Sequence, residues 1–289
     1  MLNRTRRSSC VPLSRIVPAL CAVLACFVSP HLASAAPQLF KQSAPDFYQI
    51  NAAYPGGGQA YCVPTAAADG VAWFHDQGLT NLPDAANDVD QQEQLVIDLG
   101  SAMSTDASGG TTMLNAEQGL RNYLETYYPG QVTVSGRGAY VDGNDPDAAD
   151  WTWTGQQVSQ DDTCVIVIGS LFMRYQPPGQ SWTIWERIGG HAVFLVGYDS
   201  AAGKSYCHDP DTNGSKELAE YPLAWNGSYY TIEGPSFPID PPAGTPEGTE
   251  IETELRWSDC LAYQVVPEPA SLAVLAAASL VVLRHKRRL

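Results

Sequence analysis

The sequence predicts an α+β fold in which an N-terminal helical half packs on a C-terminal antiparallel sheet. Apolar residues recur at helical spacing in three segments before residue 128, whereas strand-like runs dominate the chain after residue 131. Helices first and strands later are typical of an α+β layout. The chain is 44% hydrophobic and 16% charged, with 21 prolines and 25 glycines, which indicates a loop-rich globular protein rather than a disordered or fibrous one.

Three segments are predicted to be helical. The first, residues 64–74, has Pro64 in its first turn, where proline is tolerated, and small or apolar residues follow at helical spacing. The second and third helices are expected over residues 88–103 and 111–127. In the third helix the expected core positions are Leu114, Leu120, Leu124 and Tyr127.

Strands are predicted throughout the second half of the chain. Residues 163–171 form a run of β-branched residues of the kind that is buried in a sheet. In the other segments apolar and polar residues alternate, or glycine and proline mark the ends. A long Pro/Gly-rich polar loop is expected over residues 234–250. The predicted strands are 131–137, 163–171, 191–199, 205–208, 228–232 and 255–266.

Charge is segregated along the chain. Eight of the 16 lysines and arginines lie in the two ends, while 30 of the 31 acidic residues lie between residues 36 and 266. That middle segment therefore sets eight cations against 30 acids and carries a formal charge of −22. Such an acidic surface argues against nucleic-acid binding, which needs phosphate neutralisation. It fits an exported, strongly hydrated protein.

Residues 1–35 are predicted to be a secretory signal peptide. Four arginines between Arg4 and Arg15 precede an apolar run over residues 16–28, and the small residues Ala33-Ser34-Ala35 suit cleavage before Ala36. Two alternatives remain at this end: an uncleaved membrane anchor, and a lipoprotein signal at residues 23–26 that ends on Cys26. The prolines at 18 and 30 interrupt the apolar run, which is short for a membrane span of about 20 residues.

The C-terminal end combines three features in a fixed order. Val266-Pro267-Glu268-Pro269 is followed by an apolar stretch of about residues 270–283 and then by a basic tail, as expected for a short transmembrane helix with a positive cytoplasmic stop. This arrangement over residues 266–289 resembles the PEP-CTERM sorting signal. The resemblance implies recognition by an exosortase-type sorting protease in a Gram-negative bacterium. It implies export through the inner membrane, transient membrane anchoring and a final location at the cell surface or outside the cell. Residues 36–265 then remain for one domain.

Four cysteines belong to that domain. In an oxidising compartment Cys62, Cys164, Cys207 and Cys260 can form two disulfides, with three possible connectivities. Cys164 lies in an apolar run and is expected to be a core thiol, while Cys207 and Cys260 lie on late strands and are expected to pair.

Cys62 also allows a catalytic interpretation. It lies at the start of the first predicted helix, where free N–H groups and a partial positive charge stabilise a thiolate and can hold an oxyanion. His191 follows Gly189-Gly190 at the head of a strand and is a candidate general base. Asp209 follows the next strand, where an antiparallel partner can bring its carboxylate to the imidazole. His75 and His208 have no partner that the sequence identifies, and both are expected at the surface.

These motifs resemble the papain-like cysteine peptidases, in particular the bacteriocin-leader-processing, C39-like type. The residues that carry the resemblance are Tyr61-Cys62-Val63-Pro64-Thr65-Ala66, Gly110-Thr111-Thr112, Gly190-His191-Ala192-Val193 with Gly197-Tyr198, and Asp209-Pro210. The resemblance implies a papain-like fold and a peptide or protein substrate, with Cys62 as nucleophile, His191 as base and Asp209 as orienting group. The family has a Gln six residues before the Cys as an oxyanion donor. This chain has Gly56 there, and Gln59 is the nearest candidate for that role.

Two other interpretations of the same residues remain. The domain can keep the fold as a catalytically inactive surface or matrix binding protein, which the Gly at position 56 and the acidic surface favour. Asp209, Asp211, Asn213 and Glu220 also match the spacing of a calcium-binding loop, although a strand rather than a helix precedes them. The Cys-His-Asp chemistry itself needs no metal or other cofactor.

Overall fold

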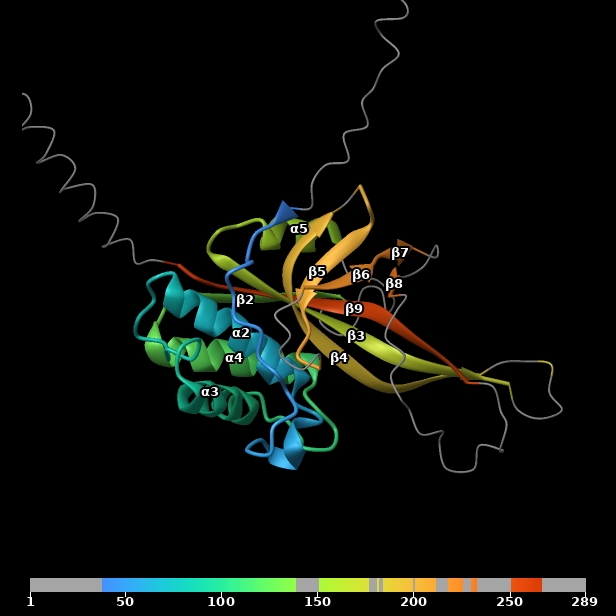
Figure 1. The fold of residues 1–289 in the computed structure, drawn as a ribbon, viewed down its shortest axis with the longest axis horizontal. Coiled ribbons are helices and arrows are strands. Elements are labelled where there is room, and N and C mark those ends of the chain that lie inside the picture. Colours follow the sequence, from blue (N-terminus) through green and yellow to red (C-terminus); the bar gives the residue numbers. More distant parts are fainter. Residues whose placement is uncertain are drawn as a thin grey trace, which may run out of the picture. The chain divides into compact units, whose positions relative to one another are not determined.

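An antiparallel sheet flanked by helices confirms the α+β prediction (Figure 1). The computed structural model describes residues 38–138, 151–176, 181, 184–199, 201–211, 218–225, 230–232 and 251–266. All of them belong to the compact unit Ala36–Leu289. The predicted signal peptide, the loop over 234–250 and the sorting signal after residue 266 lie outside these ranges. Within them, no helix has the length and apolar character needed to cross a membrane.

The three predicted helices are present, each within two residues of its predicted ends. They are α2 (Cys62–Asp76), α3 (Val89–Ala102) and α4 (Met113–Tyr127). Asp88 caps α3 by accepting hydrogen bonds from the amides of Asp90 and Gln91, and Thr112 caps α4 through the amide of Asn115. The predicted ends differ from the observed ones in α3 and α4 mainly because the capping residues were counted as helical.

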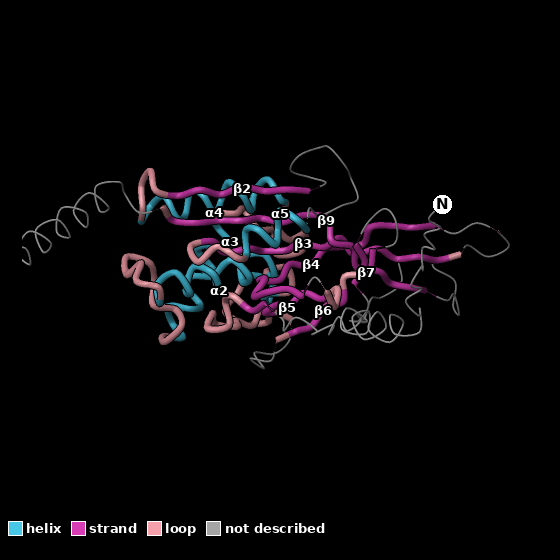
Figure 2. The backbone as a smooth tube through the Cα atoms, turned by 90° about the horizontal axis from the view of Figure 1, so that it is seen from above, coloured by secondary structure: helices cyan, strands magenta, loops and turns pink. Residues whose placement is uncertain are grey.

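The strands form one antiparallel sheet whose main path runs β6-β5-β4-β3-β9-β8-β7. Two strands join this path from the side: β1 pairs with β4, and β2 pairs with β9. Figure 2 shows β2, β9, β3, β4 and β5 following one another across the sheet. The bounds are β1 Gln38–Leu39, β2 Val132–Gly138, β3 Thr163–Tyr175, β4 Ile184–Asp199, β5 Lys204–His208, β6 Ala219–Pro222, β7 Ala224–Trp225, β8 Tyr230–Ile232 and β9 Ile251–Val265.

Several strands exceed the predictions. Strand β3 continues to Tyr175 and β4 begins at Ile184, because Phe172–Tyr175 pair with residues 184–187 in an extended hairpin. This extension contains arginine and glutamate residues and lacks the alternation that marks a half-buried strand. Strands β1, β6 and β7 are two to four residues long and were not predicted, because so short a segment gives too weak a pattern.

The sheet is buried on both faces. Cys164 and Ile166 of β3 lie in the core cluster shared with α2, α3 and α4, whereas Val165 and Val167 lie in a second cluster with Val158 of helix α5 (Trp151–Val158). Figure 1 shows α5 apart from the other three helices. Sequence analysis missed α5, because it has only eight residues and the central Gly155 is a poor helix former.

Helix α4 corrects one predicted core position. Leu120 and Leu124 are fully buried and Tyr127 is partly buried, but Leu114 is 65% exposed. Six residues separate Leu114 from Leu120, which rotates it about 240° around the helix and away from the core face.

Cys62, Cys164, Cys207 and Cys260 form no disulfide with one another, so the predicted Cys207–Cys260 disulfide is wrong. Strands β4 and β3 lie between β5 and β9. Three strand spacings put the two cysteines about 14 Å apart, beyond the roughly 7 Å that a disulfide tolerates. Cys260 instead accepts a hydrogen bond from Oγ1 of Thr154 at 2.9 Å. Cys164 is the buried core thiol that the sequence predicts, and burial raises its pKa.

We expect Gly70→Ala to destabilise the protein, although alanine normally gains about 1 kcal/mol over glycine in a helix. A Cβ at position 70 would overlap the hydroxyl of Tyr263, which donates a hydrogen bond to the carbonyl of Ala67. Overpacking of this kind costs about 1–3 kcal/mol. Urea unfolding measures the change, and Gly189→Ala is the control because nothing lies within 4 Å of that position. A more stable Gly70→Ala variant would show that α2 does not pack this closely on β9.

Candidate active site

The turn before α2 places Cys62 as the first residue of that helix. This turn is the 3-10 segment η2 (Pro55–Gly58), in which Gly56, Gly57 and Gly58 have positive φ angles of 66°, 69° and 82°. A Cβ at Gly58 would overlap the carbonyl oxygen of Gln49, so only glycine fits both the backbone angle and the packing. The Gly-rich motif thus sets the direction from which the chain enters α2.

Cys62 is a half-buried free thiol at a helix N-terminus. Tyr61, the N-cap residue, makes no side-chain capping hydrogen bond. The first-turn amides therefore keep their partial positive charge without competition from a capping side chain. This environment favours a negative charge on a sulfur or oxygen atom held there.

His191 lies on β4 and is 6% exposed. Its Nε2 lies 2.7 Å from Oδ1 of Asp209, and its side chain is close enough to Cys62 for the two groups to interact electrostatically. Strand pairing explains how Asp209 reaches it. Phe194 of β4 lies opposite His208, the last residue of β5, so in this antiparallel pair the next residue continues beside Val193, two residues from His191. The structure thus brings together the three side chains that the sequence singled out.

Asp209 is held by several donors. Tyr221 on β6 donates its hydroxyl to Oδ2, and the backbone amide of Asp211 donates to Oδ1 at 2.9 Å. Burial raises the pKa of Asp209, but the hydrogen bond and positive charge of His191, together with these two donors, lower it below its usual range. The carboxylate is therefore ionised at neutral pH, with its orientation fixed.

The same contacts act on His191 in the opposite direction. Burial alone lowers the pKa of the imidazole, but the hydrogen bond to Asp209, the contact with Cys62 and the charges of both groups raise it to about 10. Because Asp209 takes Nε2, the other ring nitrogen, Nδ1, is left for the thiol. The geometry favours a histidine that holds a proton between Cys62 and Asp209.

Gln49 and Tyr221 contact this site, and sequence analysis missed both. The backbone amide of Gln49 donates to the carbonyl of Pro210 at 2.8 Å, and its side-chain amide lies 3.5 Å from the carbonyl of Gln59. Gln49 therefore links the loop after Asp209 to the turn before Cys62. It lies in an irregular segment, and Tyr221 lies on the unpredicted β6, so neither carried a pattern that pairs it with the site.

Gln59, the candidate oxyanion donor, is exposed at the end of the turn before Cys62, and Gly56 is exposed as well.

The residues that match the calcium-loop spacing make other contacts. Asp209 faces His191, and Glu220 forms an ion pair with Lys204 at 2.7 Å. Asn213 lies outside the described residues.

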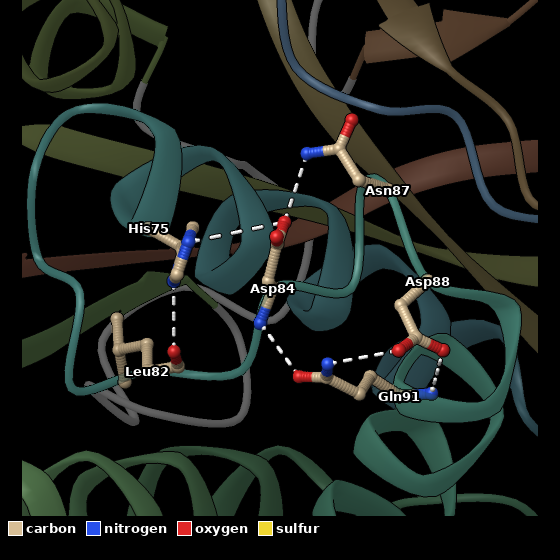
Figure 3. Close-up of polar contacts among 6 residues, drawn as sticks. All are labelled: His75, Leu82, Asp84, Asn87, Asp88 and Gln91. Atoms are coloured by element: carbon tan, nitrogen blue, oxygen red, sulfur yellow. Dashed lines mark hydrogen bonds and ion pairs between the residues drawn. The ribbon is translucent and has the colours of Figure 1, made fainter.

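Two groups of side chains in the described part of the chain have the donor atoms to hold a metal ion. Asp46, Asp69 and His208 form one group, and His75, Asp76 and Asp84 form the other (Figure 3 shows His75 and Asp84). The expectation that His208 lies at the surface is wrong, because it is 3% exposed. His75 is only partly exposed. Both histidines follow hydrophobic segments, but the sequence pattern gives no sign that the burial of these segments continues to the histidines.

We expect the stability of the protein to fall as the pH rises from about 6.5 to about 10. The pKa of His191 is raised to about 10 in the folded chain, against about 6.5 in an unfolded one. Protonation of His191 therefore contributes stability that is fully present below pH 6.5 and is lost as the pH approaches 10. Urea unfolding across this range measures the slope, which His191→Gln should reduce and the control His75→Gln should keep. Parallel profiles for the wild type and His191→Gln would contradict the assigned contacts.

Comparisons with known proteins assign no family to this chain. No protein-family model matches the chain, and no curated protein matches it either. The case for a function therefore rests on the motifs of the sequence and on the geometry around Cys62, His191 and Asp209.

Proposed function

We propose that this chain is an exported thiol hydrolase with a papain-like, C39-like domain that cleaves peptide or amide bonds. One observation carries the proposal: Cys62, His191 and Asp209 come from separate parts of the chain, and His191 hydrogen-bonds Asp209 while it interacts electrostatically with Cys62. A nucleophile, a base and a group that orients the base are the parts that acyl transfer by a thiol requires. The half-buried position of Cys62 leaves part of its surface open.

The proposed reaction begins with attack of the Cys62 sulfur on the substrate carbonyl carbon. The proton of the thiol is held by His191 at Nδ1, and Asp209 stabilises the resulting imidazolium through Nε2. The carbonyl oxygen becomes an oxyanion, and the backbone amides of Cys62 and Val63 at the uncapped start of α2 donate to it. His191 then gives its proton to the leaving amine as the C–N bond breaks. Water, deprotonated by His191, hydrolyses the thioester and restores the thiol.

We also propose that the two ends of the chain direct it to the cell surface. Residues 1–35 act as a signal peptide, and residues 266–289 act as a PEP-CTERM signal for an exosortase-type protease in a Gram-negative bacterium. The acidic segment between them, with a formal charge of −22 from eight cations and 30 acids, suits an extracellular setting.

Mass spectrometry of the ends of the mature protein tests this sorting proposal. We expect the recovered chain to begin at Ala36 and to lack the apolar stretch after about residue 269. Deleting the exosortase of the host should leave the C-terminal segment attached. A mature chain that keeps its last residues in the unmodified host would refute the proposed processing.

Alkylation of the cysteines tests the thiol chemistry without a known substrate. We expect Cys62 in the purified full chain to react with iodoacetamide at about pH 6, where an ordinary thiol is almost entirely protonated. His191→Ala should slow this reaction at least about tenfold, because the thiolate loses its cationic partner. Peptide mass mapping follows each site separately. Cys164, Cys207 and Cys260 are buried and serve as unreactive controls in the same sample.

Asp209→Asn and Asp211→Asn give a matched pair for the orienting group. Asp209→Asn should slow Cys62 alkylation at about pH 6, because an amide no longer stabilises the imidazolium. Asp211→Asn should slow it less, since Asp211 donates only its backbone amide to Asp209 and its carboxylate acts on His191 through charge alone. If Cys62 reacts like an ordinary thiol, or equally in both variants, the proposed catalytic arrangement fails.

A second candidate is a catalytically inactive surface or matrix binding protein with the same fold. The observation that favours it is the exposed Gln59, with Gly56 where the resembling family has its glutamine. Loss of one side-chain oxyanion donor typically lowers the rate by about 10²–10³. Activated Cys62 without hydrolysis of peptide thioesters or amides supports this candidate. Hydrolysis that is lost in Cys62→Ala supports the enzyme.

A further inference from the structure

A second group of chemically active side chains lies along α2, away from Cys62. Asp46 comes from the segment before η2, Asp69 lies in the middle of α2, and His208 ends β5. One oxygen of each carboxylate and one ring nitrogen of His208 all lie within 4.8 Å of one another. Three elements distant in the sequence thus direct donor atoms to one point.

Asp69 is the most informative member of this group. It is 0% exposed, and its Oδ1 accepts the backbone amide of Phe47 at 2.9 Å. Its Oδ2 is buried without a hydrogen-bond partner. Burying a carboxylate oxygen in this state is costly unless a proton or a cation satisfies it. The second carboxylate in the group, Asp46, increases that cost, because both of its oxygens are also shielded from solvent.

His208 has the hydrogen bond that a metal-binding histidine usually has. Its Nδ1 lies 2.9 Å from the carbonyl oxygen of Pro45, and a carbonyl can only accept, so Nδ1 carries the proton. In the neutral imidazole Nε2 then has a free lone pair. A second hydrogen bond to a backbone carbonyl is the common way to orient a metal-ligating imidazole. The ring also contacts Phe194, with 6.2 Å between ring centroids, which limits its rotation.

A cavity of about 490 Å³ gives access to the group. Asp46 and His208 line it together with residues 42–45 and Phe47. A cation in this cavity can therefore reach Asp46 and His208, and a carboxylate oxygen of Asp69 lies within 4.8 Å of their donor atoms.

We propose that Asp46, Asp69 and His208 form a binding site for a divalent transition-metal cation of the Zn²⁺ or Mn²⁺ class. Two carboxylates and one imidazole form a donor set that suits these ions, whereas Ca²⁺ prefers oxygen ligands alone. The ion connects the segment before η2 to α2 and to β5, so its role in this chain is structural. The site is separate from the hydrolase proposed above and does not depend on it.

The group at His75 is a weaker candidate. His75 Nε2 lies 3.8 Å from Asp84, whose carboxylate also accepts the side-chain amide of Asn87 (Figure 3). Asp76 is exposed, and the Asp84 side chain is 42% exposed. Water satisfies such groups at little cost, so they create no demand for a cation. This difference makes the group a matched control.

Metal binding to the full chain tests the proposal. The experiment uses Cys62→Ser, so that the thiol cannot bind the probe, and removes bound metal with a chelator. Titration with Zn²⁺ or Mn²⁺, followed by calorimetry and by elemental analysis after gel filtration, measures affinity and stoichiometry. We expect one ion per chain and a rise in melting temperature, with no competition from an equal concentration of Ca²⁺.

Variants then locate the ion. Asp69→Asn and His208→Gln should each weaken binding at least about tenfold, while His75→Gln should leave it unchanged. Asn at position 69 can still accept a hydrogen bond from the backbone amide of Phe47. If Asp69→Asn does not fold, Asp46→Asn tests the same site at a residue closer to the surface. The proposal is overturned if the wild-type site retains no ion, if these variants bind as tightly as the parent, or if His75→Gln abolishes binding. Cys62 alkylation in the metal-free wild type shows separately whether the proposed hydrolase site is intact.

Discussion

The close packing of α2 against the sheet is the contact on which both candidate sites depend. The helix presents Ala66, Ala67 and Gly70 to its neighbours, so its backbone approaches the strands closely enough for Tyr263 of β9 to donate to the carbonyl of Ala67. Cys62 at its first residue and Asp69 two turns later are therefore positioned by the same contact. Larger side chains on this face would move both residues away from their partners on β4 and β5.

Two adjacent residues at the end of β5 serve the two sites. His208 is the last residue of the strand and Asp209 follows it, and the two contact different neighbours. His208 contacts Phe194 and the carbonyl of Pro45 on the side of α2, whereas Asp209 contacts Tyr221 and His191. The chain after β5 is held by Gln49 through the carbonyl of Pro210. Two different chemical environments thus arise at two adjacent residues, the last of β5 and the one that follows it.

Sequence patterns predicted the parts of this arrangement that depend on local periodicity or on a short motif. Cys62 at a helix start, His191 at a strand and Asp209 after the next strand could each be identified from neighbouring residues, and the three helices from their apolar spacing. Asp69 could not, because a carboxylate inside an alanine-rich helix gives no sign of what faces it. Tyr221 and α5 also depend on tertiary packing, which overrides the weak propensities of short segments. The pairing expected for Cys207 and Cys260 failed because strand order cannot be deduced from strand positions alone.

The reduced cysteines have a consequence for the conditions under which this protein can work. Apolar packing and hydrogen bonds hold its described core together. Cys164, Cys207 and Cys260 lie buried as reduced thiols. Thiol nucleophiles outside the cell are exposed to oxidants and need reducing agents to recover from sulfenic acid or mixed disulfides. A fold stapled by disulfides would be weakened by the same agents. In the proposed hydrolase, a reductant regenerates Cys62 while the scaffold keeps its shape, so the redox state of this half-buried thiol is uncoupled from folding.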